Sequence, residues 1–445
     1  MRIFSIIKKG IGANVFAQLV TLLIQLISIP IFLAAWGVNL YGEWIVLYSI
    51  PSLLMLSDLG FTSAASNYMA MEYEKKNYSH VIKIFQSTFI LLLVFSIGIL
   101  ILIPILLSYI YNYGLFKFFI INYWQFMIIV IIFSLYISII LQCNLLNSYL
   151  RAVGKYHTGV YLENLSRIIE FIFVVIMLIN KLSPEYIAFG YLLGRLLGYL
   201  INLFIFFKNK ITFKHEFKNI DIRIIKYLVK PAFSFIGFPI GNGLNNFGII
   251  FIINNLLGPS SVVIFNTVRT VTRSALQGVN IVNNAVSPQM TIAFSSNNIK
   301  LLKKLYLYCC RFSLFGSTFA SIFLLLFGIF IIQYWTKSNQ EIDKHFFYLI
   351  LFSLPFNALW LASSVILAST NSLFFIGQIY LILSLVLLPI AYILGLTLGI
   401  FGIGLSVFFL DFFMLIFVLY KSLFMLNIRF YYFILEIFYV KKRLP

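Results

Sequence analysis

The sequence is short of charge, and of acidic charge most of all. Of its 445 residues, 32 are Lys or Arg and only 13 are Asp or Glu, so charged residues make up 10% of the chain. Soluble globular proteins carry about 25% charged residues. Together with a hydrophobic content of 62%, this deficit excludes a water-soluble fold and indicates an all-helical integral membrane protein.

Residues that build catalytic and metal sites are also scarce. The chain has three cysteines and four histidines, and their spacing suggests neither a disulfide nor a metal site. It has no GxxxxGK[ST] loop, which excludes an ATP site of that type. We therefore expect no cofactor. Any work that the protein does must draw on a partner, an ion gradient or the gradient of its own substrate.

Long apolar segments account for most of the chain. A helix needs about 20 apolar residues to span a bilayer, and we predict twelve such spans. They cover approximately residues 14–35, 44–71, 82–109, 118–148, 158–180, 186–207, 233–256, 262–293, 305–334, 346–368, 373–397 and 402–420. The first is too long for a signal-peptide core and has no small-residue cleavage site after it, so we expect it to be retained.

The basic residues are distributed unevenly among the predicted loops. If the N-terminus is cytoplasmic, 23 of the 32 Lys and Arg fall in loops on that side, four fall in the opposite loops and five lie within spans. Cytoplasmic loops carry the excess of Lys and Arg, so we predict that both termini are cytoplasmic. The net charge of +19 then reflects membrane topology, and we expect no nucleic-acid partner.

A basic segment near the midpoint divides the predicted spans six and six. We predict a six-helix bundle over residues 1–207, a basic cytoplasmic linker over 208–232, a second six-helix bundle over 233–421 and a basic cytoplasmic tail over 422–445. Apolar residues alternate with Lys and Arg in the linker, which favours an amphipathic helix on the membrane surface. An ordinary basic linker explains the composition equally well.

The eighth predicted span carries a cationic stripe. Its polar residues recur at spacings of three and four, which places them within an arc of about 80° on a helix. They are Asn266, Arg269, Arg273, Gln277, Asn280 and Asn284. Arginine near the bilayer centre costs at least about 2.5–3.5 kcal/mol, so it is normally kept where it has a use. We predict that this stripe lines a water-filled passage and binds an anionic substrate.

The first predicted span repeats this pattern without charge. Its stripe consists of Asn14, Gln18, Thr21, Gln25 and Ser28. We predict that it also lines the passage, with Gln18 and Gln25 as substrate-binding residues. Packing between helices is the alternative, because such side chains also hydrogen-bond across helix interfaces, at about 0.6 kcal/mol each.

Two further spans carry ionisable side chains at membrane depth. Glu163, Arg167 and Glu170 follow one another at i, i+4 and i+7, and we expect a charge-paired structural triad. A titrating ion-coupling site is the alternative, because burial can shift carboxylates toward neutral pH. Arg195 has no acid within its own helix, so its partner must come from another helix or from the substrate. We expect it to contact the substrate.

Asp58 and Asp411 lie near the centres of the second and twelfth predicted spans. A carboxylate at that depth pairs with a buried arginine or binds H⁺ or Na⁺. We expect charge pairing for Asp58, whereas pairing and ion coupling stay open for Asp411. Four tryptophans fall near the outer ends of spans, which is typical of an interfacial aromatic belt: Trp36, Trp44, Trp124 and Trp335.

A family resemblance rests on residues 30–69. This stretch contains Pro30, Trp36-Gly37, Tyr41-Gly42-Glu43-Trp44, Pro51, Ser57-Asp58-Leu59-Gly60-Phe61 and Asn67. It resembles the N-terminal signature of bacterial Wzx-type O-antigen flippases. The signature covers about a tenth of the chain, and no single lumen residue is carried over from the family.

The resemblance implies the fold that MATE-type exporters and lipid flippases share within the MOP superfamily, with two six-helix bundles around a central cleft. It also implies a multi-pass protein of the bacterial inner membrane that acts in lipopolysaccharide biosynthesis. The implied substrate is a short oligosaccharide on undecaprenyl pyrophosphate, turned from the cytoplasmic to the periplasmic leaflet with H⁺ or Na⁺ counter-flow. Expected partners are membrane lipid, a polysaccharide polymerase and the chain-length machinery.

Two other functions fit a multi-pass membrane protein. A MATE-like exporter of small molecules would commonly expel cations, and the arginine stripe disfavours that. A membrane polysaccharide polymerase or ligase would need a substantial outer loop to carry its site, whereas the longest predicted outer loop, near residues 108–122, is short. We therefore expect a transporter and not an enzyme.

Overall fold

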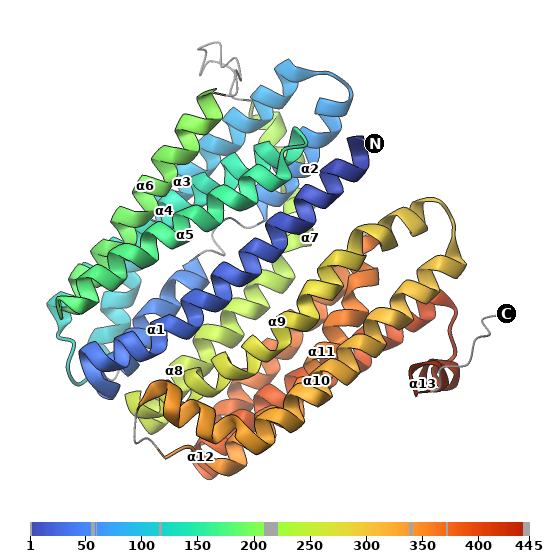
Figure 1. The fold of residues 1–445 in the computed structure, drawn as a ribbon. Helices are drawn as coiled ribbons and strands as arrows, with labels where there is room; N and C mark the ends of the chain where they lie inside the picture. Colours follow the sequence, from blue (N-terminus) through green and yellow to red (C-terminus); the bar gives the residue numbers. More distant parts are fainter. Residues whose placement is uncertain are drawn as a thin grey trace. The chain divides into compact units, whose positions relative to one another are not determined.

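The computed structural model describes residues 2–54, 58, 60–114, 118–208, 221–337, 341–370 and 373–438. Long helices make up nearly all of these residues (Figure 1). Their bounds are α1 (Arg2–Leu54), α2 (Phe61–Glu74), α3 (Tyr78–Asn112), α4 (Tyr123–Ala152), α5 (Tyr156–Ile179), α6 (Pro184–Lys208), α7 (Ile222–Gly243), α8 (Ile249–Leu257), α9 (Pro259–Ser295), α10 (Ile299–Thr336), α11 (Lys344–Ser369), α12 (Leu373–Leu426) and α13 (Phe430–Phe438), with a π-helical turn, η3 (Leu244–Gly248), between α7 and α8. Among the described residues, eight helical segments are long and apolar enough to cross a membrane. The chain is an all-helical, multi-pass integral membrane protein.

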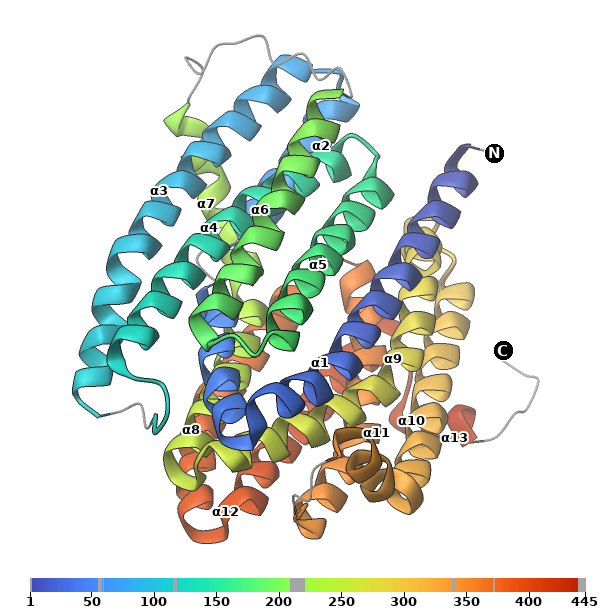
Figure 2. The same ribbon diagram turned by 60° about the vertical axis from the view of Figure 1, so that its left-hand side comes forward.

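Helix α1 folds back on itself at Gly37. This glycine has φ 69° and ψ −173°, which no helix contains. Residues twelve apart in a continuous helix lie about 18 Å apart, yet the ring centroids of Phe32 and Trp44 are 6.1 Å apart. The two stretches of α1 therefore pack side by side as a helical hairpin (Figure 2).

Helix α12 folds back in the same way at Gly399, where φ is 61° and ψ is −142°. A Cβ atom on Gly402 would overlap with the carbonyl group of Leu394. Eight residues along a continuous helix would separate these groups by about 12 Å. Only a reversal of the chain at Gly399 brings them together, and glycine accepts the positive φ that this reversal requires.

The chain forms two compact units, Met1–Val263 and Ile264–Pro445. In the first unit α4 contacts α1, α2, α3, α5 and α6. Buried residues of α2, α3, α4, α6 and α7 share one apolar core that includes Met69, Ile84, Leu145, Phe206 and Leu228. Helices α7 and α8 belong to this unit, because α7 packs on α2 and α3, and α8 packs on α1.

The predicted linker over residues 208–232 is described from residue 221 onward, while residues 209–220 lie outside the described part of the chain. Asp221 caps α7 by accepting a hydrogen bond from the backbone N–H of Arg223, at 2.8 Å. Ile224 and Leu228 are buried in the core of the first unit. The apolar face of this amphipathic segment thus packs on protein. The division into two six-helix bundles stays a prediction.

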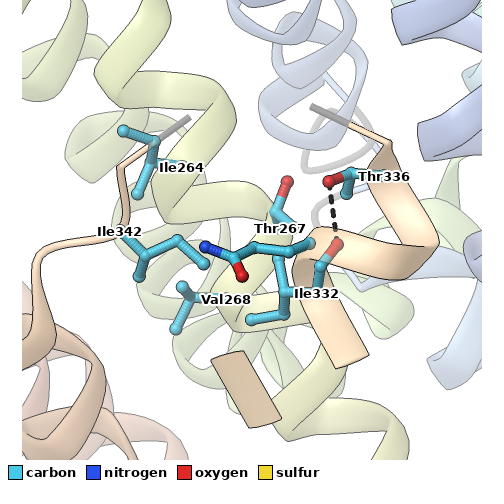
Figure 3. Close-up of a pocket in the computed structure, with 7 residues that line it drawn as sticks. Ile264, Thr267, Val268, Ile332, Thr336 and Ile342 are labelled. Carbon is cyan, nitrogen blue, oxygen red and sulfur yellow. Dashed lines mark hydrogen bonds between the residues drawn. The ribbon is translucent and has the colours of Figure 1, made fainter. Parts of the chain in front are cut away.

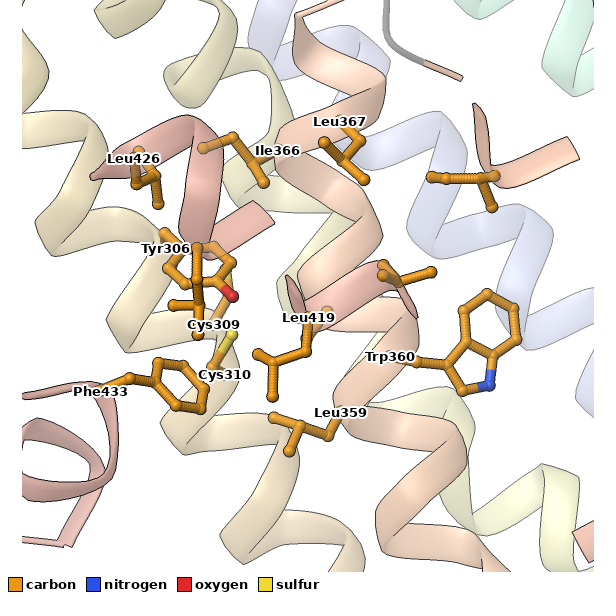
Figure 4. Packing of buried hydrophobic residues seen from close by; sticks show 14 of the residues in the cluster. Tyr306, Cys309, Cys310, Leu359, Trp360, Ile366, Leu367, Leu419, Leu426 and Phe433 are labelled. Carbon is orange, nitrogen blue, oxygen red and sulfur yellow. The ribbon is translucent and has the colours of Figure 1, made fainter. Parts of the chain in front are cut away.

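In the second unit α11 packs between α10 and α12, and α13 packs on α10. The core of this unit contains the rings of Tyr306, Trp360 and Phe433 among aliphatic side chains (Figure 4). The Tyr306 hydroxyl group hydrogen-bonds to Ser363 and Ser422 at 3.3 and 2.8 Å. Cys309 and Cys310 are free thiols in this core. Arg311 donates to the backbone carbonyl of Ile437 at 3.1 Å, which holds the end of α13 against α10.

Close packing of α6 on α5 depends on glycines one turn apart. Gly190, Gly194 and Gly198 face Met177, Glu170 and Ser166 of α5, respectively. A Cβ atom on Gly194 would lie 2.5 Å from the Glu170 Cα atom and 2.8 Å from its backbone nitrogen. Small residues at such spacing let the backbones of membrane helices approach closely. This approach brings the neighbouring Arg195 to the carboxylates of α5.

We predict that Gly194→Ala destabilises the protein by about 1–3 kcal/mol, because the added methyl group meets backbone atoms that can move only if α5 and α6 separate. The measurement is the thermal unfolding midpoint of the purified protein in detergent. Gly98→Ala is the control, since a Cβ on Gly98 meets nothing within 4 Å. Equal midpoints for the two variants would contradict the proposed packing.

Candidate functional site

The signature segment connects the turn of α1 to three loops of the first unit. The Trp36 indole donates to the carbonyl of Leu182, between α5 and α6, at 2.9 Å. Glu43 is fully buried, and its carboxylate accepts backbone hydrogen bonds from residues 119–121, between α3 and α4, at 2.5–3.3 Å. Gly42 lies so close to Pro259, where the loop after α8 meets the first residue of α9, that any side chain would overlap with it. The segment therefore fixes the ends of these helices.

Asp58 has a different role from the expected one. Its Oδ1 atom accepts a hydrogen bond from the backbone N–H of Thr62 at 2.9 Å, and the Thr62 hydroxyl group donates to Oδ2. Gly60, with φ 75°, precedes the first turn of α2. Within the described part of the chain, no Lys or Arg nitrogen forms an ion pair with Asp58. The carboxylate satisfies one of the free N–H groups at the start of α2.

Arg195 lies in a buried charge cluster. Its side chain is 4% exposed, with Nη1 at 3.1 Å from Glu163 Oε1 and Nε at 2.5 Å from Glu170 Oε1. Tyr136 of α4 donates to Glu170 Oε2 at 3.0 Å, and its ring lies 5.6 Å from the guanidinium group. Arg195 of α6 thus forms ion pairs with both carboxylates of α5. This geometry does not support the expected substrate contact, and we assign Arg195 to charge pairing.

The expected triad on α5 is divided between two arginines. Glu163 also lies 3.5 Å from Arg167 Nε, but the Arg167 side chain is 45% exposed. Its Nη1 atom donates weakly to the Thr21 hydroxyl group of α1, at 3.5 Å. Glu170 pairs with Arg195 instead. The charge cluster therefore has a buried end at Arg195 and an accessible end at Arg167.

The polar stripe of α1 is used in part for packing. Tyr156 of α5 donates to the side chain of Asn14 at 3.0 Å, and Thr21 contacts Arg167 as above. Gln18 and Gln25 are half-buried. The stripe therefore faces α5 over part of its length, and the role of Gln18 and Gln25 in substrate binding stays a prediction.

The cationic stripe of α9 is graded in exposure. Gln277 is buried; Asn266, Arg269 and Asn280 are half-buried; Arg273 and Asn284 are exposed. The Arg269 guanidinium carbon lies 5.7 Å from the centroid of the Phe265 ring, a cation–π contact. Among the described residues, no carboxylate lies within 4.0 Å of the Arg273 guanidinium group. Arg273 thus differs from Arg195 in both exposure and pairing.

Asp411 joins two helices of the second unit. Its Oδ1 atom accepts hydrogen bonds from the Asn357 amide at 2.7 Å and from the Trp360 indole at 3.0 Å, both on α11. The carboxylate also interacts electrostatically with Arg273 and Arg269. It is held by neutral donors and lies in the field of two cations, so this arrangement leaves both ion coupling and long-range charge pairing open. Asn357 and Trp360 carried no sequence signal beyond their polarity.

A small pocket lies between the start of α9 and the end of α10 (Figure 3). Its lining residues are Ile264, Thr267, Val268, Ile332, Gln333, Thr336 and Ile342. The pocket has room for about one water molecule and contains no ionisable side chain. An oligosaccharide or a diphosphate group does not fit there.

Two other sequence features look different in three dimensions. Trp44 is 2% exposed and packs among the rings of Phe32, Trp36 and Tyr191, so it belongs to the core and not to an interfacial belt. Trp124 is 75% exposed, as a belt residue would be. The described residues contain no group of three or more His, Cys, Asp or Glu that could hold a metal ion.

The comparisons with known proteins agree with this architecture. Residues 7–294 match the polysaccharide biosynthesis protein family, and the chain belongs to that family. An inward-facing multidrug resistance MATE transporter of the MOP superfamily is similar in structure, with a TM-score of 0.70, 15% identity, and 91% of this chain and 98% of that chain covered. No curated protein matches the sequence.

The lipid II flippase MurJ, in an inward closed conformation, gives a TM-score of 0.69 at 17% identity, with 96% of this chain and 95% of that chain covered. An outward-facing MATE transporter gives 0.69 at 14% identity, with 95% of each chain covered. At such identities the likeness shows the fold alone. The MATE-like fold expected from the sequence is confirmed, and the likeness extends to MurJ.

We predict that Glu43→Gln lowers the stability of the protein by about 1–3 kcal/mol, because buried backbone N–H groups lose a charged acceptor. The measurement is again the thermal unfolding midpoint in detergent, compared with Glu341→Gln at an exposed position. If Glu43→Gln unfolds at the wild-type temperature, the carboxylate does not hold the loop between α3 and α4.

Proposed function

We propose that the protein is a flippase of the bacterial inner membrane. It turns undecaprenyl-pyrophosphate-linked repeat units of O-antigen or another surface polysaccharide from the cytoplasmic to the periplasmic leaflet. The observation that carries this proposal is Arg273, an exposed guanidinium group on the polar stripe of α9 that has no carboxylate within 4.0 Å among the described residues. Membership of the polysaccharide biosynthesis protein family supports the cargo, and the MurJ-like fold supports the mode of transport.

The mechanism follows from the chemistry of the cargo. A lipid-linked sugar has a hydrophilic, diphosphate-bearing head and a tail that stays in lipid, so only the head needs a polar route. Arg273 and Arg269 can each donate two parallel N–H hydrogen bonds to phosphate oxygens. Amide side chains at Asn266, Gln277, Asn280 and Asn284 exchange hydrogen bonds with sugar hydroxyl groups as water leaves. Alternating access carries the head across without a covalent step.

We infer twelve membrane crossings with both termini in the cytoplasm. The hairpins at Gly37 and Gly399 support this number, because α1 and α12 each supply two antiparallel stretches. Helix α2 completes the second crossing, and α7 and α8 together supply the seventh. The excess of Lys and Arg in alternate loops supports the orientation.

The first test removes the accessible cation. We predict that Arg273→Gln lowers surface-polysaccharide export at least about tenfold in cells that lack the chromosomal gene, because one charge-assisted contact to phosphate contributes about 1.5–3 kcal/mol. Surface polysaccharide is quantified on cells with matched membrane levels of each variant. The control is Arg151→Gln, an exposed arginine at the end of α4.

Deletion of the gene distinguishes the three functions. A flippase defect leaves undecaprenyl-linked units facing the cytoplasm, whereas a polymerase or ligase defect leaves single units facing outward. Normal polysaccharide with an altered resistance to small molecules would instead indicate a MATE-like exporter. Either of the last two results overturns the proposal.

A second test addresses coupling. If Asp411 binds the coupling ion, Asp411→Asn abolishes the dependence of transport on the pH or Na⁺ gradient in proteoliposomes, because the amide keeps its contacts to Asn357 and Trp360 but loses the charge. Transport by the wild type that is indifferent to both gradients would remove Asp411 from a coupling role and leave it as a structural link between α11 and α12.

A further inference from the structure

The exposed side of Arg167 is not the lipid-facing side of α5. The large apolar residues that α5 exposes are Tyr161, Leu165, Ile172, Ile176 and Ile179. At 100° per residue they fall within an arc of about 60°, whose centre lies about 150° from Arg167. The side suited to lipid is therefore nearly opposite the guanidinium group. Arg167 is accessible from a different direction.

Helix α1 shows the same division and borders Arg167. Its exposed apolar residues Leu19, Leu23 and Ile27 are centred about 160° from Thr21 on the helical wheel. Thr21 belongs to the polar stripe of α1 and accepts the contact from Arg167 Nη1 at 3.5 Å. The accessible end of the charge cluster thus opens beside hydrogen-bonding side chains and away from the apolar faces of both helices.

Glu163 is shared unequally between two arginines. Its contact with Arg167 is longer, 3.5 Å, and the arginine side chain is 45% exposed. Its contact with Arg195 is 3.1 Å, and that side chain is 4% exposed. An exposed ion pair contributes about 0–1 kcal/mol to the stability of a protein, whereas removing the partner of a buried charge strongly destabilises the protein. Glu163 can therefore release Arg167 and keep its shorter, buried ion pair with Arg195.

We propose that Arg167 is an anion-binding residue of the first unit and that Glu163 occupies it until cargo arrives. An anionic oxygen group of the cargo, the diphosphate or the carboxylate of an acidic sugar, displaces Glu163 and takes both sides of the guanidinium fork. Without cargo, the two arginines and two glutamates of the cluster sum to zero charge. Arg167 can therefore stay accessible while the cluster as a whole is neutral. This inference rests on the proposed flippase function.

The test is a titration of the full-length protein in nanodiscs with inorganic pyrophosphate and, in a second arm, with glucuronate. Arg167→Gln weakens binding of the relevant anion about tenfold, and Arg167→Lys retains part of the affinity because it keeps the charge but not the fork. Glu163→Gln strengthens binding severalfold, because it removes the competing carboxylate. The double variant Arg167→Gln/Glu163→Gln binds as weakly as Arg167→Gln.

Strengthening by Glu163→Gln separates the proposal from a structural role, which would predict weaker binding and a lower unfolding midpoint. The titrations are repeated on an Arg273→Gln background, so that anion bound at α9 does not mask the site, and Arg151→Gln controls for net charge. If Arg167→Gln weakens the binding of pyrophosphate, the bound group of the cargo is the diphosphate. If it weakens the binding of glucuronate, the bound group is the carboxylate of an acidic sugar.

Arg167→Gln and Glu163→Gln variants that bind both anions as the wild type does would overturn the role of Arg167. That result would leave the flippase proposal intact, because the export defect of Arg273→Gln is measured independently. If deletion of the gene leaves export normal, the flippase proposal fails instead, whatever the anion titrations show.

Discussion

Pairing of arginine with an anion is the interaction on which the rest of the structure depends. A guanidinium group at membrane depth is expensive unless it has a partner or water, and this protein uses both solutions. Arg195 is buried and held by two glutamates of α5, at 3.1 and 2.5 Å. Arg273 stays exposed and, within the described residues, has no carboxylate within 4.0 Å. The first arrangement links α5 to α6, and the second leaves the positive charge that the proposed function assigns to cargo binding.

Backbone features place these charges. The glycines of α6 allow the close approach to α5 that brings Arg195 to Glu163 and Glu170. The reversals at Gly37 and Gly399 give each unit a helical hairpin. Glu43 and Asp58, the two acids of the signature segment, bind backbone N–H groups. These two acids therefore hold the scaffold, whereas the proposed transport role rests on the accessible arginines.

The helical membrane fold is predictable from the sequence, because hydrophobic length and 3.6-residue periodicity are local properties of a helix. The sequence could not predict which faces meet. Glu163, Arg167 and Glu170 lie on one face of α5, yet Arg195 of α6 takes both carboxylates. The break before α2, which turns Asp58 into a helix cap, leaves only a Leu-Gly signal. The α9 stripe was found because all six residues share one helix.

The most direct test of the account measures transfer between leaflets in proteoliposomes. Two undecaprenyl-linked oligosaccharides of the same sugar sequence are compared, one with the diphosphate group and one with an uncharged linkage in its place. If exposed arginines bind the anionic head, the protein transfers the diphosphate form and leaves the uncharged form behind. Equal transfer of both lipids would contradict the claim that a fixed positive charge in the membrane selects and carries this cargo.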